Sequence, residues 1–358
     1  VLIMTHRPVV ADSWFKDFQK MNMNGAGYDF GSVNKGETLE KLKEGEKPFI
    51  YFASIQLLRY NNGQTNLKDF ADVDWDLIII DEAHEGTQTE LSDTVMKELV
   101  KDHTKILELS GTPFNLLDQF DEEQVYTWDY VMEQTAKEKW SLEHPDEPNP
   151  YEPLPKVSMY TFEMKHKERF ADESKSFNFR EFFRVDDNGQ LVYKAEVRAF
   201  LDNITNPDSS TNYPFSTKAY REELRHTLWL MPGVKEANAF EDLLKEHPIF
   251  GREYKIVNVV RGASTDDGIA NDADIEKVRS AITKDPSQTK TITLTVRKLT
   301  TGVNIPEWTA VLFLSNTNSA MNYLQAAFRA QTPFSHEKLG MKTNCYIFDF
   351  APDRALTA

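Results

Sequence analysis

A run of four apolar residues followed at once by a short polar segment constrains this chain more than any other feature. Residues 77–80 read LIII, which has the length and the β-branched composition of a buried strand. Residues 81–84 read Asp-Glu-Ala-His and follow without a gap. Strands buried on both faces belong to parallel sheets, whose ligands lie at the carboxyl ends of the strands. The segment therefore predicts an α/β fold with a functional site beside Asp81.

Asp81 and Glu82 suit the hydrolysis of a nucleoside triphosphate. A Mg²⁺ ion that bridges phosphate oxygens takes a hard carboxylate, directly or through water, and Asp81 suits that role. The attacking water needs a second carboxylate to orient it, and Glu82 suits that role. We expect His84 to face away from this site and to couple it to the next element. The alternative is an acidic segment that only caps a helix and favours its dipole.

Small hydroxyl residues follow the next strand-like run. Ser110 and Thr112 belong to a Ser-Gly-Thr-Pro segment that comes directly after residues 106–109. Because the carboxyl ends of neighbouring parallel strands meet at one edge of a sheet, we expect these hydroxyls to reach His84. The three residues would then link the hydrolytic site to the rest of the molecule.

Two further motifs lie far downstream, where residues 299–306 read LTTGVNIP and residues 323–331 read YLQAAFRAQ. With the two segments described above, this series resembles motifs II, III, V and VI of superfamily 2 helicases of the DEAH type. The sequences of these motifs are most similar to those of the motor subunits of type I and type III restriction enzymes. Residues 1–8 and 52–58 resemble the motif Ia strand of that family and the segment that follows it.

The resemblance implies roles for the residues of these motifs. Arg329, late on a helix expected over 319–330, and Gln325, one turn earlier, would face a cleft between two domains. Arg329 would meet the γ-phosphate when the domains close. The resemblance places nucleic-acid phosphate contacts at Thr5, Arg7, Thr300, Thr301 and Gly302. The family has a second arginine three residues after the first, and this chain has Thr332 there.

The chain is expected to form two RecA-like parallel-sheet domains in tandem, with an irregular insertion between them. Short apolar runs alternate with amphipathic or polar stretches over residues 1–126 and again over residues 224–358. The expected strands are 2–4, 49–53, 77–80, 106–109, 227–230, 256–260, 291–295, 311–314 and 346–350. The expected helices of the second domain are 234–245, 272–283 and 319–330.

The segment 127–223 between the two domains is too long and too aromatic for a simple linker, so we expect an insertion packed on the motor. Residues 186–189 read Asp-Asp-Asn-Gly, which predicts a hairpin turn. Core packing is favoured over base stacking for its aromatic residues Tyr130, Trp140, Phe177, Phe179, Phe182 and Phe183. Glu163-Met164-Lys165 would fit the end of a metal-nuclease signature, but no upstream carboxylate in a recognisable strand accompanies it.

The phosphate-binding loop of ATP-hydrolysing motors, Gly-x-x-x-x-Gly-Lys-Ser/Thr, does not occur in the sequence. In the family this loop lies upstream of the point that corresponds to Val1. We therefore expect a fragment of a longer ATP hydrolase, which by itself binds ATP poorly and hydrolyses it hardly at all. The alternative is a relative that has lost turnover, and the intact Asp81 and Glu82 speak against it.

Charge and cysteine content restrict the partners and the compartment. A formal net charge of −16 argues against binding polyanions over the whole surface, although a local cleft can still contact DNA. The single cysteine, Cys345, allows no disulfide framework, which fits a reducing, cytoplasmic location. No apolar run approaches the length of about 18 residues that a membrane-spanning helix needs.

The sequence thus predicts the motor of a restriction-modification-type enzyme, in which ATP hydrolysis with Mg²⁺ drives movement on double-stranded DNA. Other restriction-modification subunits or domains are its expected partners. Two alternatives stay open: a DNA-binding or assembly module without turnover on the same fold, and an RNA helicase. Retention of Asp81 and Glu82 favours the enzyme, whereas the missing lysine loop and Thr332 favour the module.

Overall fold

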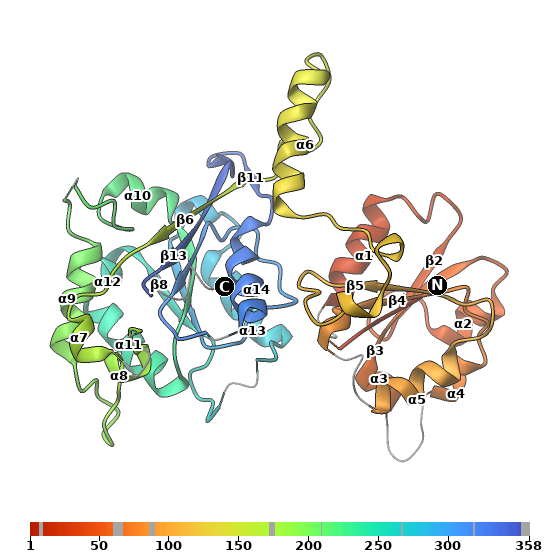
Figure 1. Cartoon of the computed structure of the whole chain (residues 1–358), viewed down its shortest axis with the longest axis horizontal. Helices are drawn as coiled ribbons and strands as arrows, with labels where there is room; N and C mark the ends of the chain where they lie inside the picture. The colour runs from red at the N-terminus through yellow and green to blue at the C-terminus, as the bar shows by residue number, and fades with distance from the viewer. Residues whose placement is uncertain are drawn as a thin grey trace. The chain divides into compact units, whose positions relative to one another are not determined.

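The computed structural model divides into two compact units, Val1–Tyr126 and Thr127–Ala358. It describes residues 1–6, 10–59, 67–85, 90–171, 176–208, 210–265, 268–317 and 319–351. Each unit is built around a parallel sheet that carries helices, which confirms the predicted α/β class (Figure 1). Among the predicted site residues, Arg7 lies outside the described residues.

The first unit contains a five-stranded parallel sheet of order β2-β3-β1-β4-β5. Its strands are β1 (Leu2–Thr5), β2 (Asp29–Ser32), β3 (Phe49–Ser54), β4 (Leu77–Asp81) and β5 (Lys105–Leu109). Its helices are α1 (Ala11–Lys20), α2 (Leu39–Glu44), α3 (Ile55–Arg59), α4 (Leu67–Ala71) and α5 (Glu90–Leu99), with short 3₁₀ turns η2 (Ala83–Glu85), η3 (Leu117–Gln119) and η4 (Glu122–Gln124).

Each face of this sheet has its own hydrophobic core, as the central strand β4 illustrates. Ile78 and Ile80 join the buried cluster on one face, whereas Ile79 packs against the cluster on the other. A strand that alternates between two cores needs apolar residues at every position. This requirement explains why β4 appears in the sequence as an unbroken apolar run.

The second unit contains a six-stranded parallel sheet of order β6-β13-β10-β7-β9-β8. Its strands are β6 (Lys156–Thr161), β7 (His226–Leu230), β8 (Lys255–Asn258), β9 (Thr291–Thr295), β10 (Ala310–Phe313) and β13 (Asn344–Asp349), and β11 (Ser335–His336) pairs separately with β12 (Gly340–Met341). Its helices are α6 (Tyr130–Glu143), α7 (Lys167–Phe170), α8 (Phe179–Phe182), α9 (Lys194–Ile204), α10 (Lys218–Glu223), α11 (Val234–Glu246), α12 (Phe250–Glu253), α13 (Asp272–Ile282) and α14 (Ala320–Ala327), with 3₁₀ turns η5 (Pro286–Gln288) and η6 (Phe328–Gln331).

Every strand expected from an apolar run is present within two residues of its expected bounds. The sequence did not indicate β2 and β6, which lie at the outer edges of their sheets. Strand β6 is exposed at four of its six positions, and β2 is a four-residue strand of sequence DFGS, so neither contains an apolar run. The helix expected over 319–330 was too long, because α14 ends at Ala327 and the chain continues as the 3₁₀ turn η6.

The segment 127–223 belongs to the second unit and not to a compact unit of its own. Strand β6 from this segment pairs with β13 over six residues, and the segment's buried phenylalanines join the same core as the sheet. The expected hairpin turn is present, since Val185 and Leu191 form an antiparallel bridge around it and Gly189 has a φ of +78°. Whether the segment is an insertion relative to other motors stays a prediction.

Helix α6 differs from the other long helices because most of its surface is open to solvent. Figure 1 shows it (yellow) extending away from the rest of the second unit. Val131, Met132 and Leu142 are among its exposed side chains, whereas Glu133 is buried. No helix in the described part of the chain is both long and apolar enough to cross a membrane.

Candidate functional site

Asp81 is the last residue of β4, and its neighbours across the sheet are Thr5 of β1 and Leu109 of β5. The side chain therefore emerges at the carboxyl edge of the central strands, as predicted from the sequence. One carboxylate oxygen, Oδ2, accepts a hydrogen bond of 2.9 Å from Nε1 of Trp14 on α1. This bond orients the carboxylate and leaves it at an edge where a bound phosphate or metal ion can approach.

Glu82 follows with a left-handed backbone, at a φ of +54°. A non-glycine residue in this region is uncommon, and such conformations concentrate at functional sites. The turn directs the Glu82 carboxylate toward the next residues, with Oε2 3.5 Å from Nδ1 of His84. About a fifth of the Glu82 side chain, 21 %, stays exposed, so the carboxylate can also meet water.

His84 connects the ends of β4 and β5. Its side chain is only 1 % exposed, and Nδ1 lies 2.8 Å from Oγ of Ser110, so the predicted contact is present. The backbone N–H of Thr112 donates to the same Oγ at 3.1 Å. Asn115 donates from Nδ2 to the His84 carbonyl at 3.4 Å. The first unit thus has a continuous polar path from Glu82 through His84 to Ser110 and Thr112.

The donor set at this edge fits Mg²⁺ better than a metal held by protein alone. Among the described residues, no group of three or more His, Cys, Asp or Glu side chains could hold a metal ion. Mg²⁺ in nucleotide sites usually keeps several waters and takes only one or two carboxylates together with substrate phosphates. A single oriented carboxylate at Asp81, with Glu82 next to it, meets that requirement.

The matching edge of the second sheet carries the loop that follows β9. Leu299 and Gly302 both have a φ of +66°, so this loop is also strained at a bulky residue. The Thr300 hydroxyl donates to the carbonyl of Arg297 at 2.7 Å, and Thr301 is 5 % exposed. Gly302 is half-buried, which leaves its backbone close to the surface.

Arg329 ties this loop to the segment that ends helix α14. Its Nε donates to the carbonyl of Gln325 at 3.0 Å, and its Nη1 donates to the carbonyl of Val303 at 3.0 Å. Both residues predicted from the downstream motif are half-buried. Their predicted place in a cleft between two domains stays a prediction.

Two of the predicted nucleic-acid contacts need correction. Thr5 is fully buried, at 0 % exposure, at the end of β1, where Ser54 of β3 and Asp81 of β4 are its neighbours in the sheet. A hydroxyl in that position cannot reach a phosphate on the surface. The side chain of Thr301 is also buried, which leaves Thr300 and the backbone of Gly302 as the accessible part of that motif.

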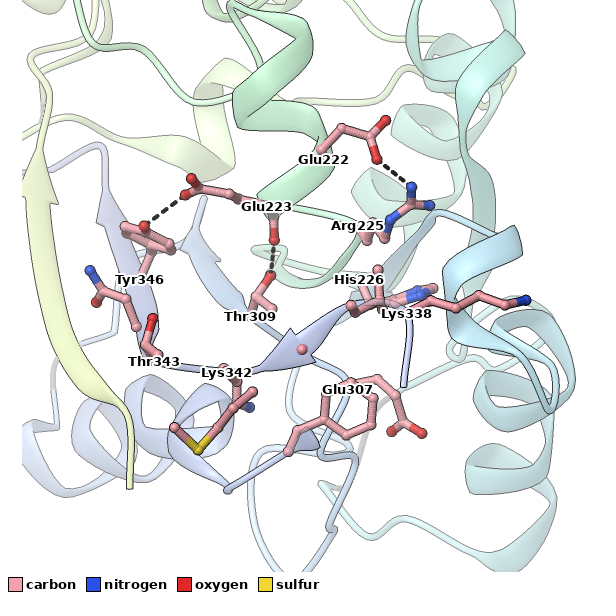
Figure 2. A pocket seen from close by; sticks show the side chains of 15 residues that line it. Glu222, Glu223, Arg225, His226, Glu307, Thr309, Lys338, Lys342, Thr343 and Tyr346 are labelled. Carbon is pink, nitrogen blue, oxygen red and sulfur yellow. Dashed lines mark hydrogen bonds and ion pairs between the residues drawn. The ribbon is translucent and has the colours of Figure 1, made fainter. Parts of the chain in front are cut away.

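A cavity of about 510 Å³ lies at the opposite, amino edge of the second sheet (Figure 2). The Tyr346 hydroxyl donates to Glu223 at 2.8 Å in its wall, and Glu222 pairs with Arg225. His226 is buried there, with Nδ1 2.9 Å from the Thr291 hydroxyl. Burial lowers the pKa of His226 to about 4.

Lys342 reaches from this cavity into the interior. Its Nζ donates to the carbonyls of Pro306 at 2.7 Å, Trp308 at 2.9 Å and Ala330 at 2.9 Å. Burial lowers the pKa of Lys342 to about 8. Because all three N–H bonds of the ammonium have acceptors, Lys342 fixes the ends of both downstream motifs.

The Glu163-Met164-Lys165 triplet lines a different cavity of about 630 Å³, together with side chains of α9 such as Asn203. Lys165 donates to Asn203 at 3.2 Å, and Glu163 lies 3.8 Å from Lys167. No metal-binding group includes Glu163 within the described part of the chain. The geometry does not support the nuclease interpretation of this triplet.

The sequence did not point to three residues that contact a predicted site residue or the turn that carries Arg329. Trp14 contacts Asp81, Glu133 contacts Gln331 beside Arg329, and Lys342 contacts Ala330. Trp14 lies in the expected helical stretch after the first strand, and its position in the sequence gave no sign of a bond to Asp81. Glu133 and Lys342 lie in stretches whose patterns marked them only as ordinary charged residues.

These motifs, their order and the two parallel sheets can be compared with known proteins. The first 115 residues match the res subunit of type III restriction enzymes. The predicted resemblance to restriction-enzyme subunits is thereby confirmed over this region, which contains Asp81, Glu82, His84, Ser110 and Thr112. Over 99 % of its length the chain is also 25 % identical to a Mycoplasma pneumoniae protein named as the C-terminus of a type II restriction enzyme and methyltransferase.

Two solved structures share the fold. An HsdR subunit fragment of a type I restriction enzyme from Vibrio vulnificus superposes over 99 % of this chain with a TM-score of 0.51 and 17 % identity. The ATP-dependent type ISP restriction-modification enzyme LlaBIII, bound to DNA, superposes over 98 % with a TM-score of 0.53 and 12 % identity. The fold of two RecA-like domains is thus confirmed. The chain spans 58 % of the Mycoplasma relative, 53 % of the HsdR fragment and 24 % of LlaBIII.

Proposed function

We propose that this chain is the core of an ATP-dependent DNA translocase or helicase of the restriction-modification type. The observation that carries the proposal is the polar path at the carboxyl edge of the first sheet, from Asp81 and Glu82 through His84 to Ser110. The match of residues 1–115 to a restriction-enzyme motor family supports it. Turnover is proposed for the full-length protein, because the sequence contains no phosphate-binding loop of the Gly-Lys-Ser/Thr type.

In this proposal each residue has a distinct task. Asp81, oriented by Trp14, would hold Mg²⁺ directly or through water, and Mg²⁺ would supply charge neutralisation to the phosphates of ATP. Glu82 would orient the attacking water, for which its exposed carboxylate is suited. Arg329 would offset the negative charge that builds up on the transferred phosphoryl group. Gln325 would assist it from the same motif.

The remaining residues would couple hydrolysis to the nucleic acid. His84, Ser110 and Thr112 would transmit the state of the Glu82 carboxylate, since a change at one bond disturbs the next. Thr300 and Gly302 would contact phosphates of the strand without reading its bases. The partner would be double-stranded DNA, with other restriction-modification subunits or domains in a cytoplasmic complex.

A second candidate is a DNA-binding or assembly module that has lost turnover. It is favoured by Arg329, whose guanidinium donates to two backbone carbonyls, and by Thr332 at the position where the family has another arginine. An arginine that serves backbone structure can persist without any catalytic task. The same fold would then contribute only binding surface.

Turnover of ATP by the full-length protein separates the two candidates. We expect double-stranded DNA to raise the rate, and Glu82→Gln to lower it by about 10²-fold or more because water orientation is lost. Glu98→Gln, an exposed residue on α5, is the matched control and should leave the rate unchanged. If the full-length protein binds DNA but does not hydrolyse ATP, the motor interpretation is wrong and the binding module is favoured. Stimulation by RNA alone would favour the RNA helicase.

A further inference from the structure

The 3₁₀ turn that carries Arg329, Phe328–Gln331, is held by two ionisable side chains from distant parts of the second unit. Lys342 donates to the Ala330 carbonyl at 2.9 Å. Glu133 of helix α6 accepts a hydrogen bond of 2.8 Å from Nε2 of Gln331. The residues on the carboxyl side of Arg329 are therefore fixed by side chains and not only by the backbone of the turn.

Glu133 is an unusual residue for helix α6. It is only 9 % exposed, and burial raises the pKa of its carboxyl, whereas its neighbours Val131 and Met132 are 69 % and 46 % exposed. An ordinary surface helix would bury the apolar residues and expose the carboxylate. Burial of a carboxylate costs free energy, which Gln134, Lys137 and Gln331 offset in part.

A second contact joins the first turn of α6 to the same 3₁₀ turn. The ring of Tyr130 packs against the ring of Phe328, with 6.2 Å between their centroids. The Tyr130 hydroxyl also accepts a hydrogen bond of 2.9 Å from the backbone N–H of Val157, where β6 begins. Asp129 caps the helix by accepting from the Met132 backbone N–H at 2.8 Å. The start of α6 is thus bound to the sheet and to the arginine turn together.

Helix α6 lies close in sequence to the connection between the two units. The first unit ends at Tyr126, and α6 begins at Tyr130, so α6 is the first helix or strand after the connection between the units. The turn of α6 that contains Tyr130 and Glu133 is therefore the part of the second unit's helices and strands that is nearest in sequence to this connection. Both residues contact the 3₁₀ turn directly.

We propose that helix α6 is a positioning element for Arg329, which acts through Glu133 on Gln331 and through Tyr130 on Phe328. The inference rests on the proposed function, because it assumes that the position of Arg329 matters for phosphoryl transfer. Arg329 itself donates to the backbone carbonyls of Gln325 and Val303, which lie beside the same turn. A shift of its turn by about 1 Å would therefore move the guanidinium and slow the reaction. Glu133 and Tyr130 are positioning residues and contact no substrate.

Hydrogen exchange of this chain tests the contact without any need for turnover. Glu133→Ala removes the acceptor of Gln331, and we expect amides of residues 328–332 to exchange about tenfold faster. Glu133→Gln keeps an oxygen acceptor and should change the exchange little. Glu138→Gln, an exposed residue on the same helix, is the control. Unchanged exchange of strand β9 shows that the variants are folded, and unchanged exchange of residues 328–332 in Glu133→Ala overturns the proposal.

Turnover of the full-length protein tests the consequence. Gln331→Glu places two carboxylates in contact, and we expect kcat to fall roughly tenfold to a hundredfold while KM for ATP changes little. Adding Glu133→Gln reverses donor and acceptor, so the double variant should regain most of kcat. If Glu133 and Gln331 only stabilised the fold, Gln331→Glu would lower the unfolding midpoint, and adding Glu133→Gln would not restore kcat.

Arg329→Ala separates a failure of the inference from a failure of the proposed function. If Arg329→Ala abolishes turnover while Gln331→Glu leaves kcat unchanged, the positioning role of α6 is overturned and the motor stands. If Arg329→Ala leaves DNA-stimulated turnover unchanged, the role of Arg329 fails, and the inference fails with it.

Discussion

The carboxyl edges of the two sheets hold their predicted residues in different ways. In the first unit, side chains contact one another directly, from Glu82 to His84 and on to Ser110. In the second unit, Arg329 donates to backbone carbonyls, and its turn is held from outside by Glu133 and Lys342. At the first edge the predicted residues contact one another. At the second edge, other residues hold the backbone turn that carries one predicted residue, Arg329.

The two edges nevertheless share one feature. Each has a bulky residue in the left-handed region after a strand: Glu82 directly follows β4, and Leu299 lies in the loop that follows β9. Such strain persists only where the surrounding contacts determine the backbone. In the first unit the surrounding contacts are polar, whereas Leu299 is fully buried in the hydrophobic core. From this difference we expect substitutions at the first edge to change turnover directly. Substitutions at the second edge should instead change the position of the backbone that carries Arg329.

The largest expected effect concerns the buried ionisable residues of the second unit. Burial lowers the pKa of His226 to about 4 from 6.5, so between these values the unfolded chain binds a proton that the folded chain does not. The free energy of unfolding of the second unit should therefore fall by about 3 kcal/mol as the pH drops from about 6.5 to about 4. Urea unfolding followed by hydrogen exchange of β7 and β9 measures it.

Two variants isolate this contribution. In His226→Asn the pH dependence between about 6.5 and about 4 should become shallower by that amount. Gln119→Ala, which changes an exposed residue without an ionisable group in the first unit, should keep the dependence of the natural protein. An equal slope in all three proteins would show that His226 is not buried in its neutral form, and the contrast between the two units would weaken.

A smaller effect is expected at the centre of the polar path. Ser110→Ala removes the oxygen that lies 2.8 Å from His84 and accepts from the Thr112 backbone. We expect DNA-stimulated turnover of the full-length protein to fall about tenfold, the effect of losing one or two hydrogen bonds, with little loss of stability. Ser13→Ala on α1 is the control. Equal turnover in Ser110→Ala and Ser13→Ala would mean that the path from Glu82 to Ser110 does not couple ATP hydrolysis to DNA.

The smallest effect is expected at the edge of the network. Trp14→Phe keeps the aromatic ring but removes the N–H that donates to Asp81 at 2.9 Å. The Asp81 carboxylate would lose its orientation, and the Mg²⁺ concentration needed for half-maximal turnover should rise about threefold to tenfold. Trp75→Phe, whose N–H donates to the Phe70 carbonyl within the core, is the comparison and should leave that concentration unchanged.

The sequence predicted the interior of both sheets well and their edges less well. Central strands such as β4 contact two cores, so their apolar runs are unmistakable. Strand β6 has exposed residues at most positions, and its sequence KVSMYT has no comparable run. It is recognisable only once β13 is seen to pair with it.

The candidate site shows the same limit. The contact of His84 with Ser110 could be expected, because each follows a strand and parallel strands end at the same edge. The bond from Trp14 to Asp81 could not be expected, because it depends on the angle at which α1 packs on the sheet. The burial of Thr5 likewise depends on its place between two neighbouring strands.

What the sequence by itself determined is the α/β class, the order of the motifs and the candidate residues of the proposed site. These features are local, since an apolar run or a four-residue motif can be read without knowledge of its neighbours. Only the tertiary structure decided that Glu133 and Lys342 hold the turn of Arg329. The physical reason is that a charged side chain has no local pattern that reveals its partner. Burial and bonding of Glu133 arise only when a helix near the start of the second unit meets a turn almost two hundred residues later, at a separation of 198 positions.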